Sequence, residues 1–240
     1  MTWRNFLDKV KRYFWFSKSE IRAFVVSALV FAFVWSFNNG RIELEDLLVS
    51  LVLVVVVMFV HHAGQRLWGL KRGFRVEQRL WWYGLVASLI LAFISYGRIK
   101  FLAASSTMIY MLYGHRLGAF RYGPNLKEFA AVCLAGPVAN ILFGTFFKQL
   151  ANMGVFPVFI ADPVFKLSLV FAAWNLLPIP PLDGSRILYS SRLFFAFLFG
   201  AISSYVLMIV FLNVYSYVFA FLFGVISWFV SYVFFEKGIS

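Results

Sequence analysis

The sequence predicts an all-α polytopic membrane protein with about six transmembrane helices. Three observations support this fold class: 62% of the 240 residues are hydrophobic, only 13% are charged, and the mean hydropathy is +0.82. A soluble domain of this size needs far less apolar surface, whereas a helical bundle in lipid needs about 20 apolar residues for each crossing. The apolar segments are continuous rather than alternating, which excludes a closed β-barrel.

Six segments are long and apolar enough to cross a bilayer. They cover residues 22–38, 46–64, 128–148, 157–177, 191–212 and 214–235. A shorter apolar stretch at 81–97, "WWYGLVASLILAFISYG", carries two glycines and is either a seventh span or a re-entrant segment. Residues 98–127 are rich in β-branched and aromatic residues and end in a Gly-Pro-Asn turn, which indicates a short β-hairpin between the second and third spans.

The distribution of basic residues favours the re-entrant alternative. If 81–97 leaves on the side where it entered, the opposite side keeps only three basic residues, namely Arg41, Lys148 and Lys166. A full crossing would transfer five more basic residues to that side, namely Arg98, Lys100, Arg116, Arg121 and Lys127. Because lysine and arginine concentrate on the cytoplasmic side, the sequence predicts six crossings of the cell membrane with both termini cytoplasmic.

Three regions follow along the chain. They are a basic amphipathic N-terminal segment at 1–21, a membrane core at 22–190 that includes the re-entrant and hairpin region at 81–127, and two C-terminal transmembrane helices at 191–240. The net charge of +12 comes from basic residues between the apolar segments. It therefore predicts attraction to anionic lipid headgroups and no nucleic-acid partner. Cys133 is the single cysteine, so no disulfide framework is expected.

Polar residues at membrane depth cost free energy, so three polar motifs stand out. "FVHHAGQRL" (59–67) is similar to the zinc-binding pattern His-Glu-x-x-His, with His61 and Gln65 on one helical face and His62 turned about 100° away. "CLAGPVANILFG" (133–144) carries Asn140, and "AAWNLLPIPPLDGSRIL" (172–188) carries Asp183. Each motif alone also fits an ordinary interfacial residue, a small-residue packing site or a turn.

Taken together and in this order, the motifs resemble those of the site-2 protease family, the M50 intramembrane zinc metalloproteases. "NLLPIPPLDG" (175–184) matches the family pattern Asn-x-x-Pro-x-x-x-Leu-Asp-Gly in full, and "AGPVAN" (135–140) matches Ala-Gly-Pro-x-x-Asn. "FVHHAGQRLWGLKRG" (59–73) matches the framework of the zinc-binding helix. The segments "GLVASLILAF" and "FLAASSTMIY" resemble the membrane-dipping and hairpin region of archaeal-type members, so the resemblance covers roughly residues 46–190.

The resemblance implies a site in which two histidines and an aspartate bind zinc, while a glutamate takes a proton from the zinc-bound water. Carried over by position, His61 and Asp183 match two of the metal ligands. Gln65 stands where the second histidine belongs, and an amide is a poor zinc ligand. His62 stands at the glutamate position, where a neutral imidazole could act as a substitute base. Two further matching positions, Asn175 and Asn140, are implied in substrate binding.

These replacements predict a proteolytically inactive homologue, a pseudoprotease with zinc absent or weakly bound. Loss of a strong ligand removes several of the roughly 10–16 kcal/mol of a structural zinc site, and loss of the base costs roughly 10²–10⁴ in rate. Such a protein would bind or regulate a partner through that partner's transmembrane segment. The alternative is an active intramembrane metalloendopeptidase with a non-standard metal site. A third reading is a structural or transport protein, although residues 191–235 contain no charge pair for ion coupling.

Overall fold

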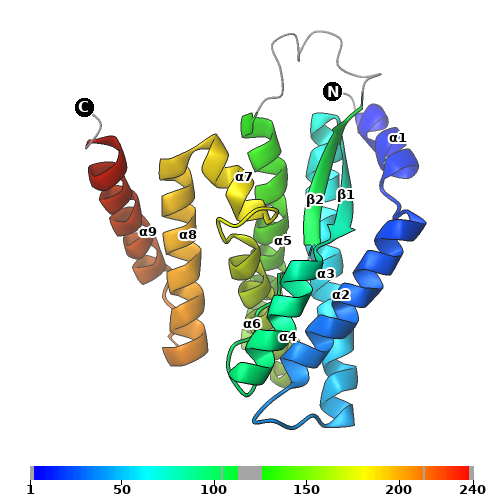
Figure 1. Ribbon diagram of the computed structural model, residues 1–240, viewed down its shortest axis with the longest axis vertical. Coiled ribbons are helices and arrows are strands. Elements are labelled where there is room, and N and C mark those ends of the chain that lie inside the picture. The colour runs from blue at the N-terminus through cyan, green and yellow to red at the C-terminus, as the bar shows by residue number, and fades with distance from the viewer. Residues whose placement is uncertain (1–2, 104, 113–125, 213, 238–240) are drawn as a thin grey trace.

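The computed structural model describes residues 3–103, 105–112, 126–212 and 214–237. The described chain is mostly helical and forms a bundle of long helices that run up and down one axis (Figure 1). Its helices are α1 (Trp3–Tyr13), α2 (Lys18–Ser36), α3 (Leu44–Arg72), α4 (Trp82–Ile94), α5 (Leu126–Asn152), α6 (Val158–Asn175), α7 (Asp183–Ser190), α8 (Arg192–Leu207) and α9 (Tyr217–Ser231). The strands are β1 (Phe74–Leu80) and β2 (Ser105–Met111), and the π-helical turns η2 (Met208–Leu212) and η3 (Tyr232–Glu236) extend α8 and α9.

The prediction of an all-α polytopic membrane fold is confirmed. Among the described residues, six helices are long and apolar enough to cross a membrane: α2, α3, α5, α6, α8 with η2, and α9 with most of η3. Among these spans, the largest difference from prediction concerns α3, which continues past residue 64 to Arg72. Hydropathy falls there, but buried positions such as Gln65, Gly69 and Leu70 keep the helical spacing, so the helix continues on its packed face.

The two strands form a small antiparallel sheet whose pairing differs from the predicted hairpin. The prediction placed both strands within 98–127, whereas β2 pairs with β1, from Phe74 opposite Met111 to Leu80 opposite Ser105. Helix α4 lies between the two strands in sequence. The sequence of β1, "FRVEQRL", alternates buried and more exposed side chains, and its outward positions carry charged residues. The predicted Gly-Pro-Asn turn at 123–125 lies outside the described residues.

The chain from β1 to β2 enters and leaves at the same end of the bundle, as a re-entrant segment does. Strand β1 descends, α4 continues toward the opposite end, and an extended stretch returns to β2 (Figure 1). At the tip, Tyr96 O accepts the Asn39 N–H at 2.9 Å, and Lys100 Nζ donates to Val34 O, Trp35 O and Phe37 O at 3.1, 3.0 and 2.5 Å. The re-entrant prediction placed Arg98 and Lys100 at the end that holds the termini, which is wrong, because the tip reaches the opposite end.

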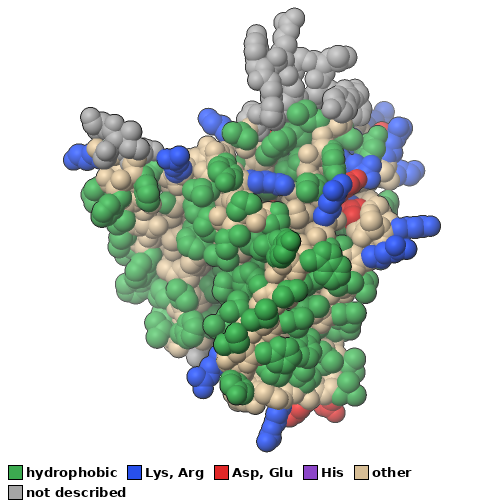
Figure 2. Space-filling view, in the orientation of Figure 1, with side chains coloured by type: hydrophobic (Ala, Val, Ile, Leu, Met, Phe, Trp, Pro, Cys, Tyr) green, Lys and Arg blue, Asp and Glu red, His purple; other side chains and the backbone are tan. Residues whose placement is uncertain are grey.

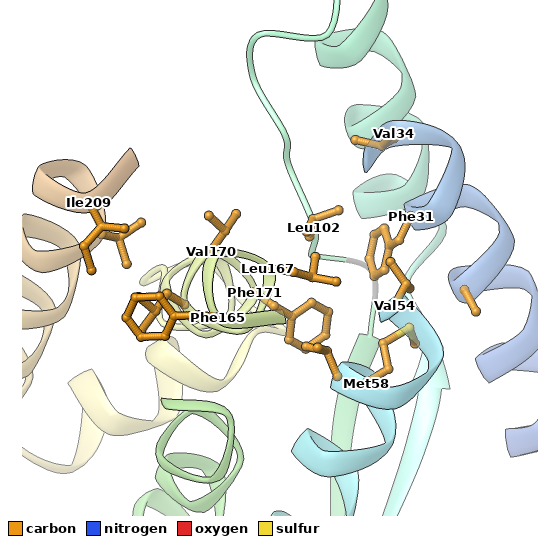
Figure 3. Close-up of a cluster of buried hydrophobic side chains, with 14 of the residues drawn as sticks. Phe31, Val34, Val54, Met58, Leu102, Phe165, Leu167, Val170, Phe171 and Ile209 are labelled. Atoms are coloured by element: carbon orange, nitrogen blue, oxygen red, sulfur yellow. The ribbon is translucent and has the colours of Figure 1, made fainter. Parts of the chain in front are cut away.

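The main apolar core lies where α2, α3 and α6 meet, with η2 closing one side (Figure 3). Phe31 of α2 packs edge-on against Phe171 of α6, with 6.0 Å between ring centroids. Phe171 in turn packs edge-on against His61 of α3 at 5.1 Å. The polar site described below is therefore held directly against the rigid core of the bundle.

The outer surface fits a lipid environment. Hydrophobic side chains cover the middle of the visible face, while lysine and arginine gather mainly at the end that carries both termini, with fewer at the opposite end (Figure 2). The most exposed span is Tyr217–Phe235, of which only 11% is buried, and it packs against α8. A helix so apolar and so little covered by protein is stable only where lipid covers the rest.

Candidate functional site

Helix α3 directs the three polar residues of "FVHHAGQRL" to two different sides. His61 and Gln65 are one turn apart and both point toward the start of α7. His62 points toward α2, where its ring packs edge-on against Phe24 with 5.9 Å between centroids. All three side chains are almost fully buried. The helical spacing seen in the sequence therefore determines which residues share a cluster.

Asp183 is positioned by the loop "NLLPIPPLDG" and by the first turn of α7. Gly184 follows it, and a Cβ atom there would lie only 1.9 Å from Leu176 O, so no other residue fits against the end of α6. This close approach folds the loop back and brings the Asp183 carboxylate to α3. A carboxylate in the first turn of a helix is also stabilised by the helix dipole.

The Asp183 carboxylate accepts hydrogen bonds at both oxygens. Its Oδ2 lies 3.1 Å from His61 Nε2 and 2.7 Å from Gln65 Nε2. Its Oδ1 accepts the Thr107 hydroxyl at 3.0 Å. A buried carboxylate is costly unless such donors surround it, so the cluster compensates for most of that desolvation.

The sheet supplies two site residues that the sequence did not reveal. Gln78 of β1 donates its Nε2 to Gln65 Oε1 at 2.7 Å, and Thr107 of β2 lies 3.3 Å from the same oxygen. Both side chains are buried. A buried polar position in the alternating strand β1 is a signal that could have pointed to Gln78. For Thr107 the sequence carried no signal, because its place depends on the register with β1.

Helix α5 holds the other side of His61. Asn140 Nδ2 lies 3.3 Å from His61 Nδ1, while His61 Nε2 faces Asp183, so the ring is held between α5 and the start of α7. A Cβ atom on Gly136 would lie 2.5 Å from His61 Nε2, so this glycine makes room for the ring. Asn175, also a predicted site residue, instead donates to Phe171 O of its own helix at 2.8 Å.

A second buried cluster secures β1 behind the site. Glu20 of α2 forms an ion pair with Arg66 of α3 and accepts the Gln78 backbone N–H at 3.0 Å. Arg66 also donates to Phe14 O at 2.6 Å and to Trp15 O at 3.2 Å. The strand that carries Gln78 is therefore held by two spanning helices and by the segment before α2.

His62, at the base position of the zinc-protease pattern, packs edge-on against His61 with 5.6 Å between ring centroids but does not reach Asp183. His62 lies in a small space lined by Phe24 and Met58, among other residues. Its Nδ1 has no hydrogen-bond partner within the described chain, and no hydrogen bond there joins it to Asp183. A proton acceptor must come within hydrogen-bond reach of the group it serves, and the His62 ring is directed toward Phe24 of α2.

The residues present do not fit a zinc ion. Within the described ranges, no three His, Cys, Asp or Glu side chains gather as a metal site would require. Gln65 turns its NH₂ group, which cannot bind a metal, toward Asp183, and its oxygen toward Gln78. His61 Nε2 lies 3.1 Å from Asp183 Oδ2, at direct hydrogen-bond distance. Hydrogen bonds thus fill the place where ligands would converge.

Comparison with known proteins gives one informative similarity. No protein-family model matches the chain, and no solved structure matches it. A protein of Methanocaldococcus jannaschii that bears the name "Putative zinc metalloprotease" is 29% identical over 201 residues, which cover 82% of this chain and 98% of that protein. Because only 18% of the chain lies outside this alignment, residues 61–183 lie within it. The chain is a multi-pass membrane protein similar to a protein with that name over almost the whole of that protein's length.

Proposed function

We propose that this protein is a proteolytically silent homologue of the site-2 (M50) proteases that holds a transmembrane segment of another membrane protein without cleaving it. The similarity to a protein named for zinc proteolysis, together with the order of the three motifs, supports the scaffold. The observation that carries the loss of proteolysis is the contact between Gln65 and Asp183. An amide NH₂ bonded to the carboxylate at 2.7 Å stands where the second metal ligand belongs.

The position of His62 supports the same conclusion. Zinc proteolysis needs a metal-bound water and a base beside it. His62 packs edge-on against Phe24 of α2, and its Nδ1 has no hydrogen-bond partner among the described residues, so an imidazole packed on an aromatic ring stands where the base belongs. Two separate defects, one in the ligands and one in the base, both act against hydrolysis.

The sheet offers a surface for holding a partner segment. The edge of β1 is covered by α2, since Glu20 accepts the Gln78 N–H. The sheet has only two described strands, so the outer edge of β2 is free of a strand partner within them. An extended peptide adds to such an edge through backbone hydrogen bonds. The partner would be a membrane protein whose transmembrane segment unwinds locally beside β2.

The test measures bound zinc and proteolysis in the purified protein. Wild-type protein is expected to contain no stoichiometric zinc and to leave a single-span membrane substrate intact. The double variant His62→Glu with Gln65→His restores both pattern positions and is expected to bind zinc, because it supplies two histidines and Asp183. Gln149→His, which adds a histidine at an exposed position of α5, is the control and is expected to bind none.

Zinc binding and proteolysis by the wild-type protein would contradict the proposal. Stoichiometric zinc in the wild-type protein, lost in Asp183→Ala, together with Asp183-dependent cleavage, would show an active metalloendopeptidase with a non-standard site. In that case the double variant would gain little. Capture of a partner is measured separately, by pull-down of a single-span segment that Thr107→Arg should weaken and the exposed control Gln149→Arg should not.

A further inference from the structure

An apolar groove lies between α3 and α5, apart from the Asp183 cluster. Its volume is about 760 Å³, and its lining includes Gly64, Leu67 and Trp68 of α3 and Ala135, Val138 and Ala139 of α5. None of the residues that line it belongs to the hydrogen-bonded cluster around Asp183. The volume falls in the range of ligand-binding cavities.

The groove exists because α3 and α5 touch through very small residues. A Cβ atom on Gly64 would lie 2.6 Å from Ala139 Cβ and 2.9 Å from Ala135 O, so the two backbones are in contact there. Larger side chains, including Leu67 and Val138, stand on either side of this contact, and both are partly exposed. The result is a narrow slot with an apolar floor and walls, set in two membrane-spanning helices.

One end of the groove is cationic and aromatic. Lys71 lies there in the last turn of α3, exposed, with its Nζ 5.0 Å from the centre of the Trp68 ring. Lys71 takes part in no ion pair with the described residues. Trp3 and Phe6 of α1 border the groove as well, and α1 lies at the end of the bundle where α3 terminates (Figure 1). Tryptophan and lysine in this arrangement are typical of the membrane–water interface.

We propose that this groove holds one anionic phospholipid, with an acyl chain between α3 and α5 and the headgroup phosphate at Lys71. An apolar slot at membrane depth that ends in a cation matches the charge pattern of such a lipid. Helix α1 borders the groove at its Lys71 end, where a transmembrane helix leaving the bilayer would meet Trp3 and Phe6. A lipid headgroup lies at the membrane surface and does not extend past Trp3 and Phe6, so a lipid fits the groove better than a transmembrane helix does.

The test counts lipids retained by the purified protein. The protein is reconstituted in phosphatidylcholine vesicles that contain a minor fraction of phosphatidylglycerol, extracted in mild detergent and analysed by native mass spectrometry. We expect one phosphatidylglycerol per chain. Val138→Phe fills the groove and should abolish retention, whereas Val56→Phe, at an equally exposed valine of α3 (39% for each side chain), should not. Lys71→Gln should lower retention about fivefold, and Lys18→Gln should have no effect.

Each other outcome overturns the proposal. Equal retention in Val138→Phe would place the lipid elsewhere. Equal retention of phosphatidylcholine, unaffected by Lys71→Gln, would remove the headgroup contact. Disulfide-linked dimers of a Val138→Cys variant would identify a second copy of the chain as the occupant. Because the groove shares no residue with the Asp183 cluster, zinc content and proteolysis are expected to stay unchanged in these variants, so the proposed function is tested separately.

Discussion

At the scale of single residues, the difference between a zinc ligand and a hydrogen-bond donor decides what this site does. A carboxylate buried as deeply as Asp183 requires compensation, either by a cation or by several donors. Here the compensation comes from Gln65 and Thr107, with His61 as a third neighbour. The amide at position 65 therefore stabilises the scaffold while it removes a metal ligand. The same replacement explains how the fold is kept at a site that, under the proposed function, no longer hydrolyses peptide bonds.

Replacing Gln65 by leucine is expected to destabilise the folded protein by about 1–3 kcal/mol, because it removes a donor from a buried carboxylate and leaves Gln78 Nε2 only its longer bond to Thr107, at 3.4 Å. The midpoint of unfolding in detergent measures this. Gln149→Leu on the exposed face of α5 is the control and should shift the midpoint little. A Gln65→Leu variant as stable as the control would show that these hydrogen bonds contribute nothing.

The sequence was sufficient to group His61, Gln65 and Asp183 as one set of candidates, and the structure brings these three together. Helical spacing and the resemblance of the motifs carry that information along the chain. Gln78 and Thr107 were missed because a strand residue is defined by its register, and the register of β1 with β2 forms across the whole of α4. Asn175 was grouped with the site, but its side chain bonds within its own helix.

At the scale of elements, the buried Arg66–Glu20 pair joins α2, α3 and β1. The exposed pair between Arg12 and Asp8 in α1 is formally similar, but both its partners are in solvent. Removing one partner of a buried pair leaves the other charge uncompensated, whereas an exposed pair contributes little. The position of β1, and with it the position of Gln78, therefore depends on a contact made by two other elements.

Arg66→Met is expected to destabilise the protein by about 3–5 kcal/mol, because Glu20 then stays buried without its cation. Adding Glu20→Gln should recover much of this loss, since glutamine is neutral and can still accept the Gln78 N–H. Arg12→Met should change stability by less than about 1 kcal/mol. Thermal unfolding of the four proteins, wild type included, makes the comparison. Equal losses in the single and double variants would exclude uncompensated charge as the cause.

The six spans were predictable because length and hydropathy alone define them. The strand β1 was not, because its outward positions carry Arg75, Glu77 and Arg79, and only its alternation with buried residues marks it as a strand. The extension of α3 to Arg72 was missed for a related reason. Its last two turns are stabilised by packing against β1 and α5, which a hydropathy window does not measure.

At the scale of the whole molecule, both termini lie at one end of the bundle and the re-entrant tip lies at the other (Figure 1). This arrangement agrees with six crossings, and the excess of basic residues at the terminal end leads us to propose that this end is cytoplasmic. The tip is anchored by Lys100, which donates to three carbonyl oxygens at the end of α2. The segment therefore spans the depth of the bundle without becoming a seventh crossing.

Cysteine labelling in sealed vesicles of known orientation tests this arrangement. Ser19→Cys and Lys237→Cys, both exposed near the terminal end, are expected to react with a membrane-impermeant maleimide from the cytoplasmic side. Asn39→Cys and Tyr96→Cys are expected to react only from the opposite side. Both residues lie at the tip of the re-entrant segment, where their backbones are hydrogen-bonded to each other. Wild-type protein, whose Cys133 is buried, is the unlabelled control. Labelling of Tyr96→Cys together with Ser19→Cys would contradict the position of the tip.

The long sequence separation within the site has a consequence for biosynthesis. His61 and Asp183 are 122 residues apart, and α4, both strands, α5 and α6 are made between them. Until Asp183 emerges from the ribosome, the buried polar groups of α3 lack their acceptor. The nascent chain must therefore keep these groups near the membrane surface, or shield them with another protein, until α7 is synthesised.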